Sequence, residues 1–186
     1  MMYLSKWQLP SSLGKNPYSL HRILWKAFPG EEGTRRPFLF RADCNGKNLS
    51  VIMLSDREPL PVEGDYLLRA NPFDIRLSPS PYAFTLRANP VKRLSQARCR
   101  VPVVGEDSLR NWLIRKTEGI CSFEKVIVSH REEMHFRKAG IPGKIVSVDY
   151  EGLLAPHDPE ALLLLIKQGI GPAKAFGCGL LLLKRL

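Results

Sequence analysis

The amino-acid sequence predicts an α+β protein composed of two tandem units with the same order of elements. Apolar residues alternate in short runs typical of half-buried strands, and they recur at helical spacing after Asn-Pro and Asp-Pro pairs. An Asn-Gly pair adds a hairpin signal. The length of 186 residues suits two small domains. We place their boundary at Ser78-Pro-Ser-Pro81, which interrupts regular structure, so that the domains comprise residues 1–77 and 78–186.

The first unit begins with a strand over residues 2–9, which is followed by an amphipathic helix. Asn16 is a favoured N-cap and Pro17 is tolerated at the first helical position. Pro29-Gly30 ends the helix. Its core-facing stripe follows the spacing i, i+3, i+4, i+7 and i+8, and consists of Leu20, Ile23, Leu24, Ala27 and Phe28.

The rest of the first unit reads as three strands. Residues 37–43 and 49–55 are joined by a turn at Asn45-Gly46, a strong hairpin signal. Residues 57–65 are rich in proline and charge and form an irregular connection to a last strand over residues 66–70. The order β-α-β-β, a variable piece and β indicates a ferredoxin-like unit.

The second unit opens with a strand over residues 82–88 that leads into a basic loop. Asp107 or Ser108 can cap the helix that follows, because short polar side chains accept hydrogen bonds from the first helical N–H groups. This helix stops at Gly119, where glycine is a common terminator.

The second unit continues with strands over residues 123–129 and 145–152, and the charged residues 130–138 form the tip of the hairpin between them. Asp158-Pro159 begins the last helix, and the run over residues 180–183 is the last strand. The order is again β-α-β-β-α-β, so we predict two tandem ferredoxin-like domains.

This order of elements is also that of the RNA-recognition motif, a four-stranded sheet with two helices on one face. That module carries a run of aromatic residues on a central strand, and the sequence contains no such run. We therefore expect any bound RNA to contact basic loops and the cleft between the domains, without base stacking on the sheet.

The charge of the chain points to a polyanionic partner. Its formal net charge is +10 at pH 7, which favours nucleic acid first and an anionic membrane second. The sequence has no run of 18 apolar residues, and residues 1–10 lack the apolar core of a signal peptide. We expect a cytoplasmic protein with no membrane partner.

The sequence predicts no metal site and no cofactor. Its four cysteines, Cys44, Cys99, Cys121 and Cys178, are scattered without a Cys-x-x-Cys pair, and a reducing cytosol disfavours disulfides. His130 and His135 are five residues apart among charged neighbours, a spacing that does not place two ligands on one helical face.

The first helix carries candidate acid–base residues at the edge of its buried stripe. Tyr18, His21 and Trp25 gather on one flank, at about 100° of rotation per residue. An imidazole has an ordinary pKa of about 6.5 and can act as general acid or base near neutral pH. Arg22 and Lys26 lie next to this flank and are candidates for phosphate contact, although such cations commonly form a solvated face.

A glycine-rich segment near the end of the chain is the second candidate. Gly169, Gly171, Gly177 and Gly179 form two Gly-apolar-Gly pairs around a single cation, Lys174. Glycines permit close approach of the backbone to a phosphate, but the segment can equally be a helix-to-strand connection. It is not a P-loop, since no Gly-Lys-Ser/Thr follows, and not a dinucleotide fingerprint, since it follows a helix.

Together, these stretches resemble the CasE-type CRISPR-associated endoribonucleases of type I-E systems. The resemblance is carried by Asn16-Pro-Tyr-Ser-Leu-His-Arg22, Leu86-Arg-Ala-Asn-Pro90, the start at Asp158-Pro159 and the Gly-x-Gly-x5-Gly-x-Gly-Leu-Leu segment from Gly169. These pieces occur in the expected order over almost the whole chain. The last is the most specific.

The resemblance implies an enzyme that cuts CRISPR precursor RNA at the base of each repeat hairpin without metal. The 2′-OH of the upstream nucleoside attacks the adjacent phosphate and leaves a 2′,3′-cyclic phosphate and a 5′-OH. His21 and Tyr18 become the catalytic candidates, and the glycine-rich segment becomes one wall of an RNA groove opposite their helix. Implied partners are the repeat hairpin, as precursor and mature crRNA, and the other subunits of the type I-E interference complex.

Basic residues of the second domain are the candidates for binding the RNA stem. A-form RNA is read mainly through its shape and phosphates. The first candidates are on the predicted hairpin tip and the next ones on the basic loop: Arg131, Arg137, Lys138, Arg98 and Arg100. Two alternatives remain open at this point, a non-catalytic RNA-binding subunit on the same fold and a metal-dependent nuclease.

Overall fold

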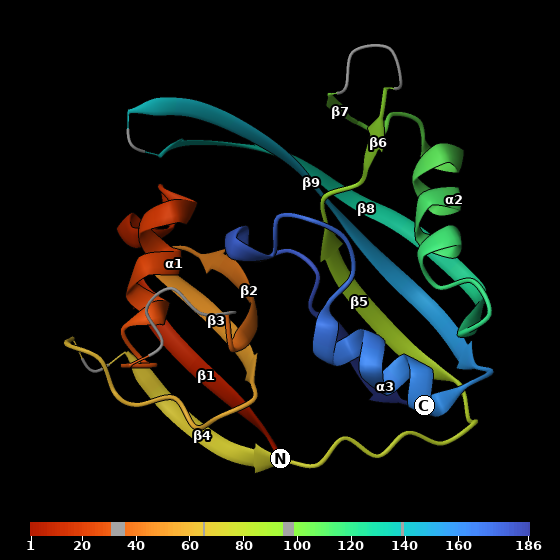
Figure 1. Ribbon diagram of the computed structural model, residues 1–186, viewed down its shortest axis with the longest axis horizontal. Coiled ribbons are helices and arrows are strands. Elements are labelled where there is room, and N and C mark those ends of the chain that lie inside the picture. The colour runs from red at the N-terminus through yellow and green to blue at the C-terminus, as the bar shows by residue number, and fades with distance from the viewer. Residues whose placement is uncertain (31–35, 65, 95–98, 139) are drawn as a thin grey trace. The chain divides into compact units, whose positions relative to one another are not determined.

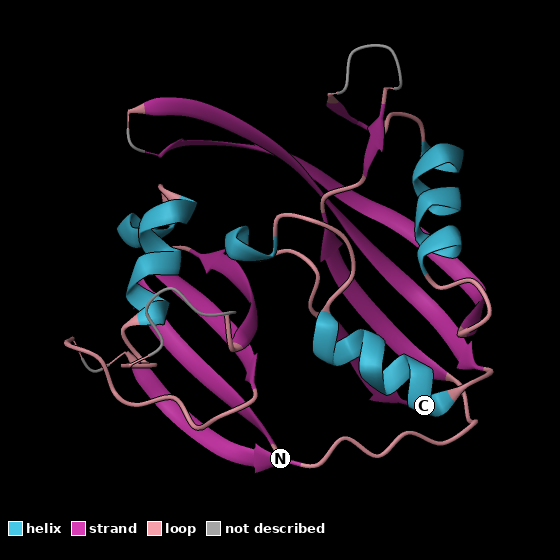
Figure 2. Ribbon diagram, in the orientation of Figure 1, coloured by secondary structure: helices cyan, strands magenta, loops and turns pink. Residues whose placement is uncertain are grey.

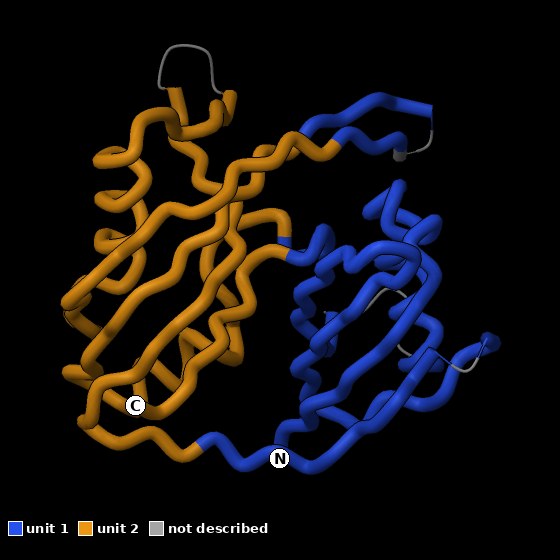
Figure 3. The backbone as a smooth tube through the Cα atoms, turned by 180° about the vertical axis from the view of Figure 1, so that it is seen from behind, with its two compact units in different colours: residues 1–75, 135–144, 174–177 blue, residues 76–134, 145–173, 178–186 orange. Residues whose placement is uncertain are grey.

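The computed structural model describes residues 1–30, 36–64, 66–94, 99–138 and 140–186 (Figures 1 and 2). Internal contacts divide the chain into two compact units, which Figure 3 shows in different colours. Unit 1 comprises Met1–Ile75, His135–Lys144 and Lys174–Gly177, and unit 2 comprises Arg76–Met134, Ile145–Ala173 and Cys178–Leu186. Two segments that are distant in sequence from the first 75 residues therefore belong to unit 1. The boundary between residues 77 and 78 stays a prediction.

Unit 1 contains a four-stranded antiparallel sheet in the order β2-β3-β1-β4. Its elements are β1 (Met2–Pro10), η1 (Ser11–Gly14), α1 (Pro17–Trp25), β2 (Phe38–Asn45), β3 (Asn48–Ser55), β4 (Leu67–Phe73) and the short η2 (Lys174–Phe176). The strand order is that of a ferredoxin-like sheet, and the fold class predicted from the sequence is confirmed for this unit.

Helix α1 begins as the sequence predicts. The Asn16 side chain accepts a hydrogen bond from the Tyr18 N–H at 3.1 Å, and Pro17 occupies the first helical position. The helix is shorter than predicted, because 3₁₀-type hydrogen bonds between residues three apart replace α-helical ones at its end. The Ala27 N–H donates to the Leu24 carbonyl, and the Phe28 N–H donates to the Trp25 carbonyl.

The core of unit 1 lies between α1 and one face of the sheet. Trp7 and Leu9 of β1 are buried there together with Leu20 and Leu24 of α1. Met53 of β3 completes the contact. Burial of such apolar side chains stabilises the unit by about 1.5–3 kcal/mol for each large residue. The core therefore fixes which flank of α1 faces outward.

Unit 2 contains a second four-stranded sheet, in the order β10-β5-β9-β8, and the two helices α2 and α3 (Figure 1). Its elements are β5 (Tyr82–Ala88), β6 (Val91–Arg93), β7 (Arg100–Pro102), α2 (Glu106–Lys116), β8 (Cys121–Lys138), β9 (Ile141–Pro156), α3 (Pro159–Gln168) and β10 (Leu181–Arg185). The end of the β8–β9 hairpin, His135–Lys144, belongs to unit 1. The order again matches the ferredoxin-like prediction. Helix α3 begins at Asp158-Pro159 as predicted, and the Asp158 side chain caps it by accepting a hydrogen bond from the Ala161 N–H at 2.9 Å. No helix of the described residues is long and apolar enough to cross a membrane.

Three local predictions for the second unit are wrong. Residues 130–138 are not a hairpin tip but the continuation of β8, an 18-residue strand that neighbours the 16-residue β9 in the sheet. The basic loop contains a two-stranded ribbon in which Arg93 lies opposite Arg100. Helix α2 begins earlier than Asp107, with Gly105 as N-cap and no side-chain cap, and its first turn carries acidic residues that suit the helix dipole.

Gly152 of β9 is a position where the sheet leaves no room for a side chain. A Cβ atom there would lie 1.9 Å from the main-chain oxygen of Lys125 on β8. Backbone cannot move aside as a flexible side chain can. We expect Gly152→Ala to lower the free energy of unfolding by about 3 kcal/mol, measured by chemical denaturation.

Gly119→Ala is the matched control for Gly152→Ala, because nothing lies within 4 Å of a Cβ atom at Gly119. This glycine has a φ of +75°, so the substitution costs only the left-handed conformation, about 1–2 kcal/mol. Equal costs for the two substitutions would contradict the close approach of β8 and β9.

Candidate active site

Helix α1 places Tyr18 and His21 one turn apart, as its helical spacing predicts. Both side chains are half-buried, at the margin between the core stripe and solvent. A phenol and an imidazole on neighbouring turns can act on one substrate group, because residues three apart lie on the same side of a helix. Arg22 is exposed beside them, and Lys26 follows at the C-cap of the helix.

Aromatic rings hold the His21 imidazole in place. Its centroid lies 6.2 Å from that of Trp25 in an edge-to-face arrangement, and 6.0 Å from that of Phe38 on β2. Trp25 itself packs against Phe38 at 5.7 Å, which supports a packing role for this tryptophan. The imidazole is thus packed against its neighbours: the residue as a whole is half-buried, and its Nε2 atom is buried.

The middle of the glycine-rich segment belongs to the same unit as α1. Element η2 packs against both α1 and β2. The close fit with β2 is seen at Gly177, where a Cβ atom would approach the Phe40 ring to 3.3 Å. Lys174, the single cation of the segment, is half-buried in η2. We call Tyr18, His21 and Lys174 the α1–η2 site.

A pair of phenylalanines connects the β8–β9 hairpin to the α1–η2 site, and the sequence did not reveal it. The rings of Phe136 on β8 and Phe176 on η2 lie 4.5 Å apart within unit 1. Gly143 makes room for Phe136, since a Cβ atom there would lie 2.3 Å from the ring. The only sequence signal is that Phe136 is an aromatic residue within a run of charged ones.

The outer parts of the glycine-rich segment are anchored by main-chain hydrogen bonds in unit 2. The Gly169 N–H donates to the Leu165 carbonyl at 2.8 Å, and the Ile170 N–H donates to the Gly179 carbonyl at 2.9 Å. The Gly179 N–H donates to the Arg87 carbonyl on β5 at 2.7 Å. The N–H groups of Gly169 and Gly179 are therefore used within the protein, and both residues are buried.

The inner glycine of the first pair, Gly171, is also closely packed. A Cβ atom there would lie 2.8 Å from the Trp112 ring of α2, at a φ of +80°. Phosphate contact by the four glycines stays a prediction. Their observed contacts show how the segment is shaped: its two ends are held in unit 2 and its middle in unit 1.

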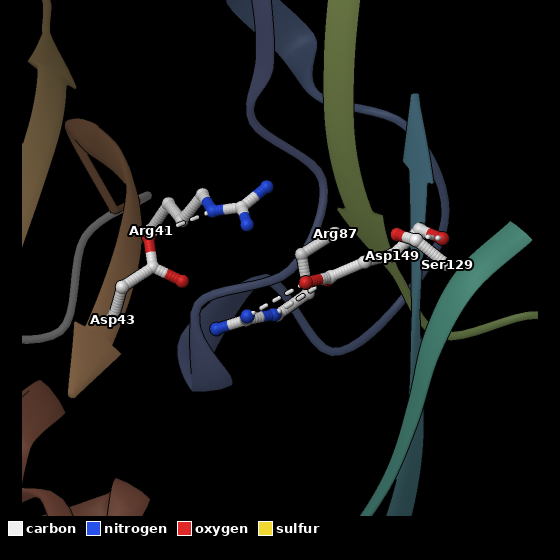
Figure 4. Close-up of polar contacts among 5 residues, drawn as sticks. All are labelled: Arg41, Asp43, Arg87, Ser129 and Asp149. Atoms are coloured by element: carbon white, nitrogen blue, oxygen red, sulfur yellow. Dashed lines mark hydrogen bonds and ion pairs between the residues drawn. The ribbon is translucent and has the colours of Figure 1, made fainter. Parts of the chain in front are cut away.

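A largely buried ion pair lies beside the anchored end of the segment (Figure 4). The Arg87 guanidinium donates two hydrogen bonds to the Asp149 carboxylate, at 2.7 and 2.8 Å. The two side chains are 14% and 13% exposed. Ser129 donates from its hydroxyl to the Asp149 main-chain oxygen at 3.4 Å. The pair thus links β5 to β9 close to the point where the Arg87 main-chain oxygen of β5 accepts the Gly179 N–H, and the Ser129 hydroxyl bond links β8 to β9.

The cysteines offer no activated nucleophile in the buried positions. Burial raises the pKa of the Cys178 thiol to about 12, and burial likewise raises the pKa of Cys121. A thiol is nucleophilic only as the thiolate, so both are inert near neutral pH. Within the described ranges, no group of three or more His, Cys, Asp or Glu side chains could hold a metal ion.

The remaining basic candidates occupy different places. Arg131 is exposed on β8 in unit 2, where it lies 3.9 Å from Glu133, and Arg137 is exposed on the part of β8 that belongs to unit 1. Lys138 ends β8, and Arg100 is exposed on the ribbon strand β7. Arg98 lies outside the described residues. RNA contact by these residues stays a prediction.

Comparison with known proteins finds relatives along the whole chain. A family model described as "CRISPR associated protein" matches residues 2–185. The chain is 34% identical over 199 aligned positions to the CRISPR system Cascade subunit CasE of Escherichia coli, and the match covers all of both chains.

A second relative connects the fold to RNA. The chain is 29% identical to the CRISPR-associated endoribonuclease Cse3 of Thermus thermophilus, over 89% of each chain. The solved structure of Thermus thermophilus Cse3 bound to an RNA representing a pre-cleavage complex is 30% identical, with a TM-score of 0.86 over 98% of each chain.

Proposed function

This chain belongs to the CasE-type family of CRISPR-associated proteins, and we propose that it is an endoribonuclease that cuts CRISPR precursor RNA at the base of the repeat hairpin. The observation that carries the proposal is the packing of η2 against α1 within one unit. This packing brings a cation-bearing element to the helix that presents Tyr18 and His21. The endoribonuclease name and the RNA-bound structure of the Thermus relative support the same reaction class.

The arrangement suits cleavage by an internal nucleophile. The 2′-oxygen of the upstream nucleoside forms a bond to phosphorus, and the bond from phosphorus to the 5′-oxygen of the next nucleoside breaks. The 2′-OH gives up its proton to a base, and the leaving 5′-oxygen receives a proton. The products are a 2′,3′-cyclic phosphate and a 5′-OH. Because attacking and attacked groups belong to one molecule, positioning alone supplies much of the rate.

His21 is assigned the transfer of a proton. A positioned general acid or base typically contributes ~10²–10⁴-fold. Tyr18 orients the 2′-OH or shares the proton transfer, and Lys174 offsets the charge that develops on the phosphorane oxygens. Trp25 and Phe38 fix the imidazole.

Stem binding is assigned to the β8–β9 hairpin. Arg131 and Arg137 are exposed on β8 and can neutralise phosphates, and the Phe136–Phe176 contact ties the hairpin to η2. A stem bound to the hairpin would thereby be held in a fixed position relative to the α1–η2 site. The cut RNA stays bound as the protein acts in a cytoplasmic interference complex, by analogy with the Cascade subunit that it resembles.

Cleavage is expected to need no metal. A repeat hairpin RNA incubated with the protein in excess EDTA should be cut at the same rate as in buffer with Mg²⁺, as followed on a denaturing gel. The described residues contain no cluster of metal ligands that could supply a catalytic ion. An RNA of the same composition with the stem scrambled is the control and should stay intact. Loss of cleavage in EDTA, restored by added Mg²⁺, would contradict the metal-independent mechanism.

A further inference from the structure

A cavity lies on the face of the unit 1 sheet that α1 does not cover. Its volume is about 450 Å³, and it is lined by side chains of β1, β3 and β4, including Lys6, Ile52, Arg69 and Phe73. Side chains alternate along a strand, so Lys6 points away from the face on which its neighbour Trp7 joins the core beneath α1. The cavity is therefore separate from the α1–η2 site.

Two cations line this cavity. Lys6 of β1 lies directly opposite Arg69 of β4 in the antiparallel register, and both are exposed. Like charges in directly opposed positions destabilise a sheet. No Asp or Glu is among the described residues that line the cavity. An anionic ligand would relieve the repulsion between these two cations.

An aromatic ring and an amide complete the cavity. Phe73, at the end of β4, is 39% exposed, although large apolar side chains of a sheet are usually covered. Asn71, which can donate to and accept from a base edge, lies two residues before it on the same face. Exposed aromatic rings beside cations are the features by which proteins bind single-stranded nucleic acid, through base stacking and phosphate contact.

We propose that this surface, the β1–β4 site of Lys6, Arg69, Asn71 and Phe73, binds single-stranded RNA that flanks the repeat hairpin. The proposal rests on the proposed function, because the β1–β4 site would bind the single-stranded part of the same RNA whose hairpin is cut at the α1–η2 site. Its volume falls within the ~300–1,000 Å³ of small-ligand sites, which suits about one nucleotide. The prediction that RNA does not stack on the sheets relied on the absence of an aromatic run from a central strand, whereas Phe73 lies at the end of the edge strand β4.

The test compares two RNAs made noncleavable by a 2′-deoxy nucleotide at the cut site: the bare hairpin, which ends with the one nucleotide that follows the cut site, and the hairpin with longer single-stranded flanks. Binding is measured by fluorescence anisotropy for the full chain and for the Lys6→Ala/Arg69→Ala variant. We expect the variant to bind the flanked RNA about tenfold more weakly and the bare hairpin equally well. Loss of two phosphate contacts should also reduce the salt slope for the flanked RNA by about 1.4.

Lys15→Ala/Lys47→Ala is the matched control, since both lysines are exposed in unit 1 and neither lines the cavity. Phe73→Ala should weaken binding of the flanked RNA and Phe73→Tyr should preserve it. If Phe73→Ala binds like the parent, the cavity is a charged patch that fits an acidic protein segment, and the proposal is wrong. Equal losses on both RNAs would overturn it too.

The same preparations separate this inference from the proposed function. Each variant is also assayed for cleavage of an unmodified bare hairpin, which should proceed at the parental rate. A parent protein that neither binds nor cuts the hairpin would contradict the proposed function. A parent that cuts the hairpin but gains no affinity from the flanks would contradict only the β1–β4 site.

Discussion

Replacing His21 by alanine is expected to slow cleavage of the repeat hairpin by ~10²–10⁴-fold while RNA affinity stays unchanged. The imidazole is the group assigned to proton transfer, and it lies at the edge of α1, where its removal leaves the basic residues of the hairpin untouched. Single-turnover cleavage with protein in excess measures the chemical step, and a binding assay on a noncleavable RNA measures affinity.

A second substitution separates chemistry from packing. The His21 ring contacts Trp25 and Phe38, so His21→Gln retains part of the side-chain volume without the imidazole proton exchange. It should be as slow as His21→Ala. His157→Ala is the control, because His157 is exposed in unit 2 and its variant should cleave at the parental rate. Parental cleavage by His21→Gln would contradict the assignment of His21.

The largest stability effect is expected at the ion pair of unit 2. Asp149→Ala leaves the Arg87 guanidinium in a largely buried position without the carboxylate that it bonds at 2.7 and 2.8 Å. Breaking such a pair by removing one partner typically costs about 3–5 kcal/mol. We expect a loss of that order in the free energy of unfolding, measured by chemical denaturation.

The pair formed by Arg41 and Asp43 in unit 1 provides the comparison (Figure 4). It has a similar distance, 2.9 Å, but Asp43 is 47% exposed, so solvent screens the attraction. Asp43→Ala should cost less than about 1 kcal/mol. Similar costs for Asp43→Ala and Asp149→Ala would show that burial does not decide the strength of the Arg87–Asp149 pair.

Loss of the Arg87–Asp149 pair should also weaken the anchoring of the glycine-rich segment. The main-chain oxygen of Arg87 accepts the Gly179 N–H, so the strand that carries Arg87 is the strand that anchors this end of the segment. Hydrogen exchange of the Gly179 amide is expected to accelerate in Asp149→Ala and to remain unchanged in Asp43→Ala. We therefore expect the ion pair to stabilise this end of the glycine-rich segment through the strand β5.

Local signals predicted most of the elements correctly. Asn16-Pro17 and Asp158-Pro159 begin helices because capping is decided by the residues at the helix start itself, and Gly46 forms the hairpin turn with a φ of +60°. The long continuation of β8 escaped prediction because residues 130–138 carry charges without alternation. Pairing with β9, the other arm of the same hairpin, makes that stretch a strand, and the charged sequence of residues 130–138 carries no signal of that pairing.

The sequence predicted the arrangement of the candidate residues on α1 but not the contacts that other elements make with α1. Helical spacing brought Tyr18 and His21 together, because residues three apart in a helix are neighbours whatever the rest of the fold. The approach of η2 to α1 depends on the folding of unit 1 around a segment from the other end of the chain, and only the family resemblance suggested it. The Phe136–Phe176 contact had no signal that distinguished it from a solvated loop.

A single 2′-deoxy nucleotide immediately upstream of the mapped cut site tests the cleavage mechanism most directly. The mechanism uses that 2′-OH as the nucleophile, so the substituted hairpin should bind with parental affinity and remain uncut, while the all-ribose RNA yields a 2′,3′-cyclic phosphate. Cleavage of the deoxy-substituted RNA at the same position, or a product with a 5′-phosphate, would contradict the mechanism.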